Sequence, residues 1–242
     1  MSRGHIIRLL GDDHVVFGVF SGEKTPEQGA RIAENRETDF VFYCLETGPF
    51  DIPSMEAYMR AMAQEAGEQG AHPVLVRIPP VRDGRDAARE RVARALGAGV
   101  DGIVFPHVET ADEAAFAVGS LGDDVWPGDS DGRLLGVLLI EDQVGVRNAR
   151  DIVAIPGVGV VVLGPGDLGR AYQGDDQAVE RAIQTVLAIC KEVEVPCGIT
   201  AGADDVAERL AQGFRLIIVT GDDALPVGRA AAARASLEPR SR

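Results

Sequence analysis

Short apolar runs recur along the chain, and each is followed by a segment in which polar and apolar residues alternate at helical spacing. Most of these runs are continuously apolar, as in the strands of a parallel sheet that is buried on both faces. We therefore expect eight strands, at Val15–Phe20, Phe40–Cys44, Pro73–Ile78, Gly102–Phe105, Leu134–Ile140, Val158–Leu163, Cys197–Thr200 and Leu216–Val219.

The segments between the runs have the composition of helices. Ser54–Gly67 and Arg85–Leu96 are rich in Ala, Glu, Arg and Met, which are good helix formers. Asp175–Val193 places its apolar residues at helical spacing. Gly122–Gly132 combines Gly, Pro and Asp and is typical of a surface loop. Strands and helices alternate again beyond this loop, so the pattern predicts one domain over residues 1–242.

Eight strands that alternate with helices over 242 residues favour an α/β fold, a single (β/α)8 TIM barrel, which typically needs about 250 residues. The main rival is a doubly wound open sheet with a glycine-rich phosphate turn after its first strand. The segment GVFSGEKTPEQ contains neither form of that turn, which weakens the rival.

Composition narrows the setting and the partners. The net charge of −14 disfavours nucleic acid, because an acidic surface repels phosphate. The three cysteines, Cys44, Cys190 and Cys197, form no CxxC pair, so we expect neither a disulfide framework nor a zinc site. No apolar run approaches the roughly 18 residues of a membrane span, and the N-terminal segment does not resemble a signal peptide. These features favour a cytoplasmic protein.

Polar side chains follow several of the predicted strands. In a barrel enzyme the catalytic groups lie where strands end, at the C-terminal face. Five strand ends would therefore bring acidic, basic and imidazole groups to one opening. These residues are Glu46, Arg77, His107, Glu141 and Asp167.

Two of the carboxylates suit a metal ion. Glu141 directly follows the apolar run LLGVLLI, where a carboxylate is costly unless it is paired or bound to a metal. Asp167 ends a Gly-Pro-Gly-Asp turn. Two carboxylates, completed by water and substrate oxygens, commonly hold Mg²⁺, and Mn²⁺ accepts similar ligands. In the alternative, Glu141 pairs with Arg77 and Asp167 caps the following helix, and the spacing leaves both hypotheses open.

The basic residues restrict the carbonyl chemistry. The planar fork of Arg77 matches a substrate carboxylate, and an ion pair of Arg77 with Glu46 or Glu141 is compatible with that role. The chain has only Lys24 and Lys191, and neither is predicted inside the barrel opening. A Schiff base needs a lysine there, so activation of a carbonyl would fall to a metal acting as a Lewis acid.

The chain resembles the HpcH/HpaI aldolase/citrate lyase family of metal-dependent (β/α)8 enzymes, and most of all its 2-oxo-acid aldolase branch. The resemblance runs from about Phe17 to Val219, and the strand followed by Gly-Pro-x-Asp-Leu together with the upstream Ile-Glu is its most specific part. The segments that carry it are DFVFYCLETGPFD, VLVRIP, ALGAGVDGIVFPHVETADEA, LLIEDQVGV and VVVLGPGDLG.

The resemblance implies a role for each site residue. Glu141 and Asp167 match the metal ligands, for Mg²⁺ or Mn²⁺, with Co²⁺ as a further candidate. Arg77 matches the arginine that contacts the pyruvate-like substrate. The backbone amides of Gly166 and Asp167 match those that receive the substrate carboxylate. Glu46 matches an acidic residue that supports the site through hydrogen bonds.

The chain departs from the family at one motif. Aldolase members usually have Asp-x-Glu-His after the second strand, and this chain has Cys44-Leu45-Glu46-Thr47. The family's histidine is the acid/base group, and the hydroxyl of Thr47 cannot replace it near neutral pH. His107, predicted at the same opening, is one substitute, and a metal-bound water is an equally good one. His107 could instead be a loop histidine that hydrogen-bonds a neighbour.

We therefore expect a metal-dependent carbon–carbon lyase, a class II pyruvate-type aldolase that cleaves or forms 4-hydroxy-2-oxo acids through a metal-stabilised enolate. Its partners would be a 2-oxo acid and an aldehyde. The alternatives are an oxo-acid decarboxylase, a CoA-thioester lyase, and a barrel that binds metal and oxo acid without turnover. Family analogy further predicts a homo-oligomer, a trimer or hexamer, in which the helix over residues 225–237 is exchanged.

Overall fold

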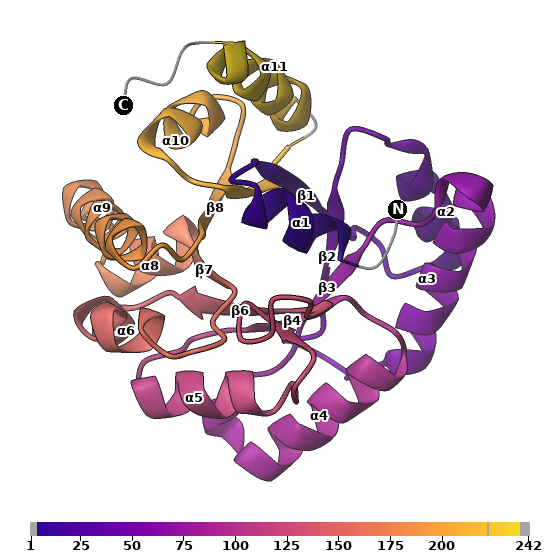
Figure 1. Ribbon diagram of the computed structural model, residues 1–242, viewed down its shortest axis with the longest axis horizontal. Helices are drawn as coiled ribbons and strands as arrows, with labels where there is room; N and C mark the ends of the chain where they lie inside the picture. The colour runs from indigo at the N-terminus through magenta and orange to yellow at the C-terminus, as the bar shows by residue number, and fades with distance from the viewer. Residues whose placement is uncertain (1–3, 222, 238–242) are drawn as a thin grey trace.

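The chain forms a closed ring of eight parallel strands with one short strand at its edge (Figure 1). This computed structural model describes residues 4–221 and 223–237. The ring closes because the last strand pairs with the first and the fourth with the sixth, all in parallel register. Within the described residues the strands are β1 Val16–Phe20, β2 Phe40–Cys44, β3 Val74–Arg77, β4 Gly102–Phe105, β5 Val125–Trp126, β6 Leu134–Ile140, β7 Val160–Leu163, β8 Cys197–Ala201 and β9 Leu216–Val219.

Helices surround the ring, which confirms the predicted (β/α)8 barrel (Figure 1). Several of them begin at a side chain that accepts a hydrogen bond from the first turn, such as Thr25, Thr110 and Asp175. The helices are α1 His5–Gly11, α2 Pro26–Glu34, α3 Ile52–Ala66, α4 Arg85–Gly97, α5 Ala111–Gly119, α6 Gln143–Arg147, α7 Ala149–Val153, α8 Pro165–Ala171, α9 Asp176–Glu192, α10 Val206–Gln212 and α11 Ala224–Leu237, with 3₁₀ turns η1 Gly67–Gln69 and η2 Val81–Asp83.

The buried side chains divide into two layers, as they do when strands alternate inward and outward. The larger layer lies between the ring and the outer helices and includes Phe17, Tyr43 and Phe105. The smaller layer fills the inside of the ring and includes Phe40 and Phe42. Gly18 makes room there, since a Cβ at this position would lie 2.1 Å from the ring of Phe40. The barrel interior is therefore a packed core rather than a channel.

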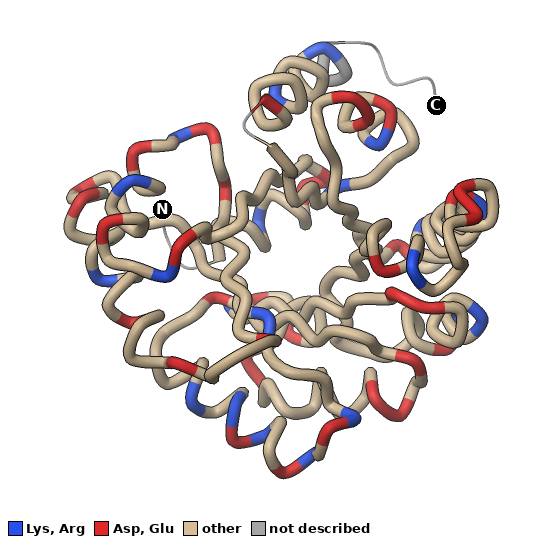
Figure 2. Tube along the Cα trace, turned by 180° about the vertical axis from the view of Figure 1, so that it is seen from behind, with Lys and Arg blue, Asp and Glu red and all other residues tan. Residues whose placement is uncertain are grey.

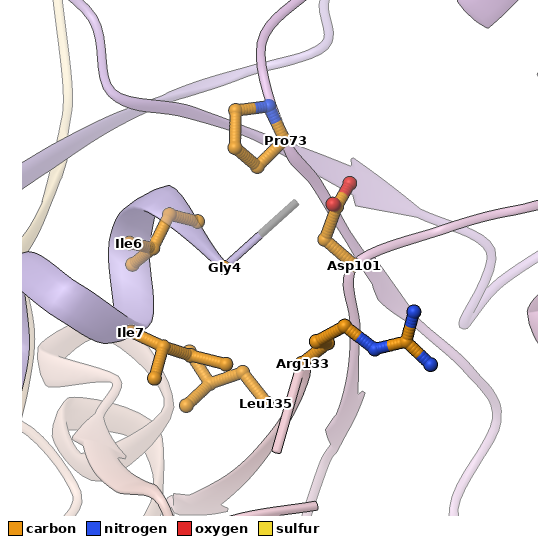
Figure 3. A pocket seen from close by; sticks show the side chains of 7 residues that line it. All are labelled: Gly4, Ile6, Ile7, Pro73, Asp101, Arg133 and Leu135. Carbon is orange, nitrogen blue, oxygen red and sulfur yellow. The ribbon is translucent and has the colours of Figure 1, made fainter. Parts of the chain in front are cut away.

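Helix α1 closes the N-terminal end of the barrel interior, and it was not among the predicted elements. Its buried residues Ile6, Ile7 and Leu10 belong to the inner layer. A cavity beside α1, lined by Pro73 and Leu135 among others, has an interior of about 10 Å³, room for about one water molecule (Figure 3). The interior of the ring is thus nearly filled at this end.

One detail differs from the prediction. The expected loop Gly122–Gly132 contains the short strand β5, which pairs with the start of β6 because Val125 is buried there. The predicted domain range of 1–242 includes residues 1–3, 222 and 238–242, which lie outside the described residues.

Most charged residues lie on the outer helices and loops (Figure 2). Within the described chain, no helix is both long and apolar enough to span a membrane.

Candidate active site

The ends of β2, β3, β4 and β6 bring four charged side chains into contact at one end of the barrel. Parallel strands all end at the same face of the ring, so residues distant in sequence meet there. Arg77 and His107 both reach Glu46 and Glu141, and each approach is 4.0 Å or less. The predicted convergence at the strand ends is present for these four residues.

Arg77 is held from two sides. Its Nη2 lies 3.1 Å from Oε2 of Glu46, whereas Nη1 lies 4.0 Å from Oε1 of Glu141, so Glu46 is the nearer partner. Nε and Nη2 also donate to Sγ of Cys44, at 3.3 and 3.2 Å. The guanidinium lies 5.4 Å from the ring centroid of Phe42. These contacts hold the fork mainly through Nε and Nη2.

His107 lies between the two glutamates. Nε2 is 3.2 Å from Oε1 of Glu46 and Nδ1 is 3.3 Å from Oε2 of Glu141. The hydrogen bond with Glu46 raises the pKa of His107 against the opposing effect of burial, with further contributions from Glu141, Glu46 and Asp167. Burial acts to raise the pKa of Glu46, but its hydrogen bond with His107 and the charge of Arg77 lower it overall. The imidazole is thus a polarised group that can carry a proton.

Glu141 is the most buried carboxylate of the site, with 4% of its surface exposed. Burial raises the pKa of Glu141 to about 7; the charge of His107 acts against this, and the like charge of Asp167 adds to it. The cations nearby therefore compensate this buried carboxylate only in part. A further positive charge beside Glu141 would be stabilised.

Asp167 and Glu141 flank one small space. A Cβ placed on Gly164 would lie 2.9 Å from Oε1 of Glu141 and 3.5 Å from Oδ2 of Asp167. Glycine at this position therefore leaves room between the two carboxylates. Asp167 lies in the first turn of α8 and pairs with Arg170, but the N-cap residue of α8 is Gly164. Asp167 is therefore not the N-cap of α8, contrary to that alternative hypothesis.

The donor set fits a hard divalent cation. Within residues 4–221 and 223–237, no group of three His, Cys, Asp or Glu side chains could hold a metal by itself. A pair of carboxylates with room between them suits Mg²⁺ or Mn²⁺, which keep waters and substrate oxygens as ligands. The space beside Gly164 and the burial of Glu141 are therefore consistent with the predicted ion.

The remaining predicted residues lie around this cluster. The side chain of Thr47 is exposed. The amides of Gly166 and Asp167 lie in the first turn of α8, where N–H groups have no carbonyl partner within the helix. Lys24 lies over the ring of Tyr43, which faces the outer layer. The remaining lysine of the chain is on α9, and it donates to a backbone carbonyl.

Two residues that sequence reasoning missed support the site. Arg82, in η2, donates to the carbonyl oxygen of His107 and pairs with Glu109. The feature of the sequence that could have pointed to Arg82 is its position five residues after Arg77, in the segment that follows β3. Gly164 leaves the space between the carboxylates, and its signal was the Gly-Pro-Gly-Asp turn that it opens. Neither role follows from sequence spacing, because both depend on contacts across the barrel opening.

Comparison with known proteins agrees with this geometry. Residues 17–226 match the model of a family described as HpcH/HpaI aldolase/citrate lyase. The chain is similar to the hydroxypyruvate/pyruvate aldolase of Delftia acidovorans, with 28% identity over 240 residues, 87% of this chain and 83% of that protein.

Solved structures give the same fold. A crystal structure of a HpcH/HpaI aldolase/citrate lyase family protein from Burkholderia cenocepacia J2315 matches with a TM-score of 0.77 and 25% identity, covering 98% of this chain and 99% of that one. The citrate lyase β subunit of M. tuberculosis, complexed with oxaloacetate and magnesium, matches with a TM-score of 0.66 and 19% identity, covering 91% and 98%.

Proposed function

Because this chain belongs to the HpcH/HpaI aldolase/citrate lyase family, we propose that it is a class II aldolase that cleaves or forms 4-hydroxy-2-oxo acids. One observation carries the proposal: Glu141 and Asp167 flank the space left by Gly164, next to Arg77 and His107. A metal pair, a carboxylate-binding fork and a proton carrier are the parts that enolate chemistry needs.

Glu141 and Asp167 are the proposed metal ligands. The ion is Mg²⁺ or Mn²⁺, with Co²⁺ as a further candidate, and two carboxylates leave room in its shell for waters and the oxygens of a 2-oxo acid. Such an ion, when bound, supplies Lewis-acid stabilisation of the enolate form of the oxo acid. The magnesium held by the M. tuberculosis citrate lyase β subunit supports this choice.

Arg77 and the start of α8 are proposed to orient the oxo acid. The carboxylate of the substrate would receive hydrogen bonds from the backbone amides of Gly166 and Asp167. Nη1 of Arg77, which lies 4.0 Å from Oε1 of Glu141, would contact a substrate oxygen while Nη2 stays on Glu46. A planar fork suits this divided task better than an ammonium group.

His107 is proposed to move the proton. In cleavage, the C3–C4 bond of the substrate breaks, its electron pair enters the enolate, and the C4 hydroxyl proton passes to the imidazole. The aldehyde leaves, and the imidazolium of His107 then gives this proton to C3 of the enolate, which yields a pyruvate-type acid and restores the neutral ring. Glu46 holds Nε2 and favours the protonated ring, as a carboxylate partner does. Thr47, exposed at the opening, takes no part in this transfer.

The substrate class, compartment and assembly are proposed from a relative, the free cysteines and family analogy. The 2-oxo acid is of the pyruvate type, as in the aldolase from Delftia acidovorans, and its partner is a small aldehyde. The cysteines Cys44, Cys190 and Cys197 are free thiols, which suits a cytoplasmic protein. A homo-oligomer, a trimer or hexamer, with the helix over residues 225–237 exchanged between subunits, follows from family analogy.

The test separates enolate formation from aldehyde choice. Exchange of the methyl protons of pyruvate in D₂O, followed by proton NMR, needs no aldehyde. We expect exchange with Mg²⁺, Mn²⁺ or Co²⁺, and none after EDTA treatment or in Glu141→Ala. Condensation with a panel of short aldehydes then identifies the partner. Exchange and condensation that survive both EDTA and Glu141→Ala would overturn the proposal.

Three other outcomes point to the alternative functions. Release of CO₂ from oxaloacetate without any condensation would favour a decarboxylase. Binding of acetyl-CoA in a titration would favour the thioester lyases. Tight pyruvate and Mn²⁺ binding with no exchange would indicate a barrel that binds without turnover.

A further inference from the structure

His107 has a backbone conformation that histidine does not favour. Its φ of +53° lies in the left-handed region, where the Cβ of an L residue crowds a backbone oxygen. A residue stays in this region only when its surroundings fix it there. The contacts around His107 therefore determine where its imidazole points.

Polar contacts hold the backbone on both sides of His107. Its N–H donates to Oε2 of Glu141 at 3.1 Å, and its carbonyl oxygen accepts a hydrogen bond from Nη2 of Arg82. The next amide, that of Val108, donates to the carbonyl of Leu139 at 3.0 Å. Arg82 is thus the side chain that fixes the peptide group following His107.

Arg82 is itself anchored to the segment that it holds. Nη1 lies 2.5 Å from Oε1 of Glu109, and Nε lies 4.0 Å from Oε1 of Glu113 at the start of α5. The other oxygen of Glu113 accepts the amide of Glu109 at 2.8 Å, and Nδ2 of Asn148 donates to the Glu109 carbonyl at 2.8 Å. One guanidinium therefore spans a carbonyl and a carboxylate, which a lysine cannot do with the same geometry.

From these contacts we propose that Arg82 is a positioning residue for proton transfer, which holds the His107 peptide so that the imidazole stays between Glu46 and Glu141. The inference rests on the proposed function, because that function gives His107 its task. No contact of Arg82 with Glu141 or Asp167 is present in the described chain, so its loss removes no direct contact of the metal pair. A displacement of about 1 Å in a reacting group can slow a reaction on the order of 100-fold.

The test compares Arg82→Ala and Arg82→Lys with His107→Asn and with the double variant Arg82→Ala/His107→Asn. The control is Arg85→Ala, which removes an arginine paired with Asp112 in the first turn of α5. In the pyruvate exchange assay with Mn²⁺ we expect kcat to fall about 10- to 100-fold in Arg82→Ala, with KM for pyruvate within about twofold. Arg82→Lys falls between wild type and Arg82→Ala, and Arg85→Ala exchanges like wild type.

The double variant shows whether Arg82 acts through His107. Positioning predicts that it is no slower than His107→Asn alone, because the group to be positioned is already gone. Independent, multiplying effects would overturn the inference. It would also fall if Arg82→Ala exchanged at the wild-type rate, or lost Mn²⁺ and pyruvate affinity as much as rate, which indicates a structural defect.

The same experiments distinguish this inference from the proposed function. If wild type shows metal-dependent exchange that Glu141→Ala abolishes, while Arg82→Ala matches Arg85→Ala, the function stands and the positioning role is wrong. If wild type shows no metal-dependent exchange at all, the proposed function fails and the role of Arg82 fails with it.

Discussion

Nε2 of His107 lies 3.2 Å from Oε1 of Glu46. The pair joins the segments that follow β2 and β4, and the other oxygen of Glu46 lies 3.1 Å from Nη2 of Arg77. One carboxylate therefore orients both the proposed proton carrier and the proposed substrate fork. The sequence resemblance predicts the aldolase histidine at the position of Thr47, whereas in this structure Glu46 contacts His107, which follows another strand.

Replacing Glu46 with glutamine tests this arrangement. The amide oxygen still accepts a hydrogen bond, but the charge that favours the protonated imidazole is lost. We expect kcat for pyruvate exchange to fall on the order of 10-fold, with a smaller change in KM. Glu180→Gln, which breaks an ion pair with Arg209 on the outer helices, is the control. An unchanged rate in Glu46→Gln would contradict the role of the pair.

Metal binding should be visible as thermal stabilisation. A ligand at about 100 times its Kd stabilises the folded state by about 2.7 kcal/mol. For a chain of this size, 1 kcal/mol shifts Tm by roughly 2–4 °C. We therefore expect Mn²⁺ to raise the Tm of wild type by roughly 5–10 °C and that of Glu141→Gln by much less. Calorimetry with and without EDTA checks this, and equal shifts in both proteins would exclude Glu141 as a ligand.

Gly164 offers a test that leaves both carboxylates in place. The Cβ of Gly164→Ala would lie 2.9 Å from Oε1 of Glu141, so the space between Glu141 and Asp167 closes. We expect Mn²⁺ affinity to fall on the order of 10-fold or more. Gly169→Ala, on α8, meets no atom within 4 Å and serves as the matched control. Titration of both variants by Mn²⁺ paramagnetic resonance checks the difference; equal affinities would show that the space is not the metal site.

His72 makes stability depend on pH. It is 2% exposed, and neither ring nitrogen has a hydrogen-bond partner in the described chain. Burial lowers the pKa of His72, as does the charge of Arg36, while the Ile32 backbone and Asp39 act to raise it. The unfolded chain therefore binds the proton more readily. The stability that neutral His72 allows is present above about pH 6.5 and is lost as the pH falls below it.

His72→Met should remove this component. The slope due to one proton is at most about 1.4 kcal/mol per pH unit, so the free energy of unfolding should fall less steeply below pH 6.5 in the variant. Urea unfolding between pH 5 and 8 measures it. His14→Gln, at an exposed histidine, should keep the wild-type slope. The same slope in His72→Met and wild type would rule out the buried ring as its source.

Arg229 anchors the C-terminal helix α11 to the base of the barrel. Its Nη2 lies 2.8 Å from Oδ2 of buried Asp39, its Nε donates to the Glu37 carbonyl at 2.7 Å, and its guanidinium lies over Phe17. Arg229→Ala leaves Asp39 without its cation, so we expect a loss of about 1–3 kcal/mol. Thermal unfolding checks this against Arg234→Ala, at an exposed position of α11, which should change Tm little.

The strands and most helices could be predicted because their own residues carry the pattern. A continuous apolar run such as Leu134–Ile140 is a buried parallel strand, and β6 has those bounds. Helix α1 could not be predicted in this way. Its seven residues are short of a clear helical pattern, and they are ordered because Ile6, Ile7 and Leu10 pack against side chains inside the ring.

The candidate site also has a part that the sequence predicts and a part that it does not. Chain order alone placed Arg77, Glu141 and His107 at strand ends, since all parallel strands end at one face. The left-handed backbone of His107 could not be foreseen, because it depends on Glu141, 34 residues away, and on Arg82, 25 residues away. Local sequence carries no signal for contacts that exist only after the barrel has closed.

Helix α1 has a consequence for the order of events in a catalytic cycle. Ile6, Ile7 and Leu10 fill the N-terminal end of the barrel interior, so both reactants would enter and leave through the C-terminal opening. If the oxo acid binds at buried Glu141 as proposed, it arrives first and departs last, and the aldehyde lies between it and solvent. Steady-state kinetics should therefore be sequential and ordered, with pyruvate competing against the intact hydroxy-oxo acid and the aldehyde acting as a noncompetitive product inhibitor.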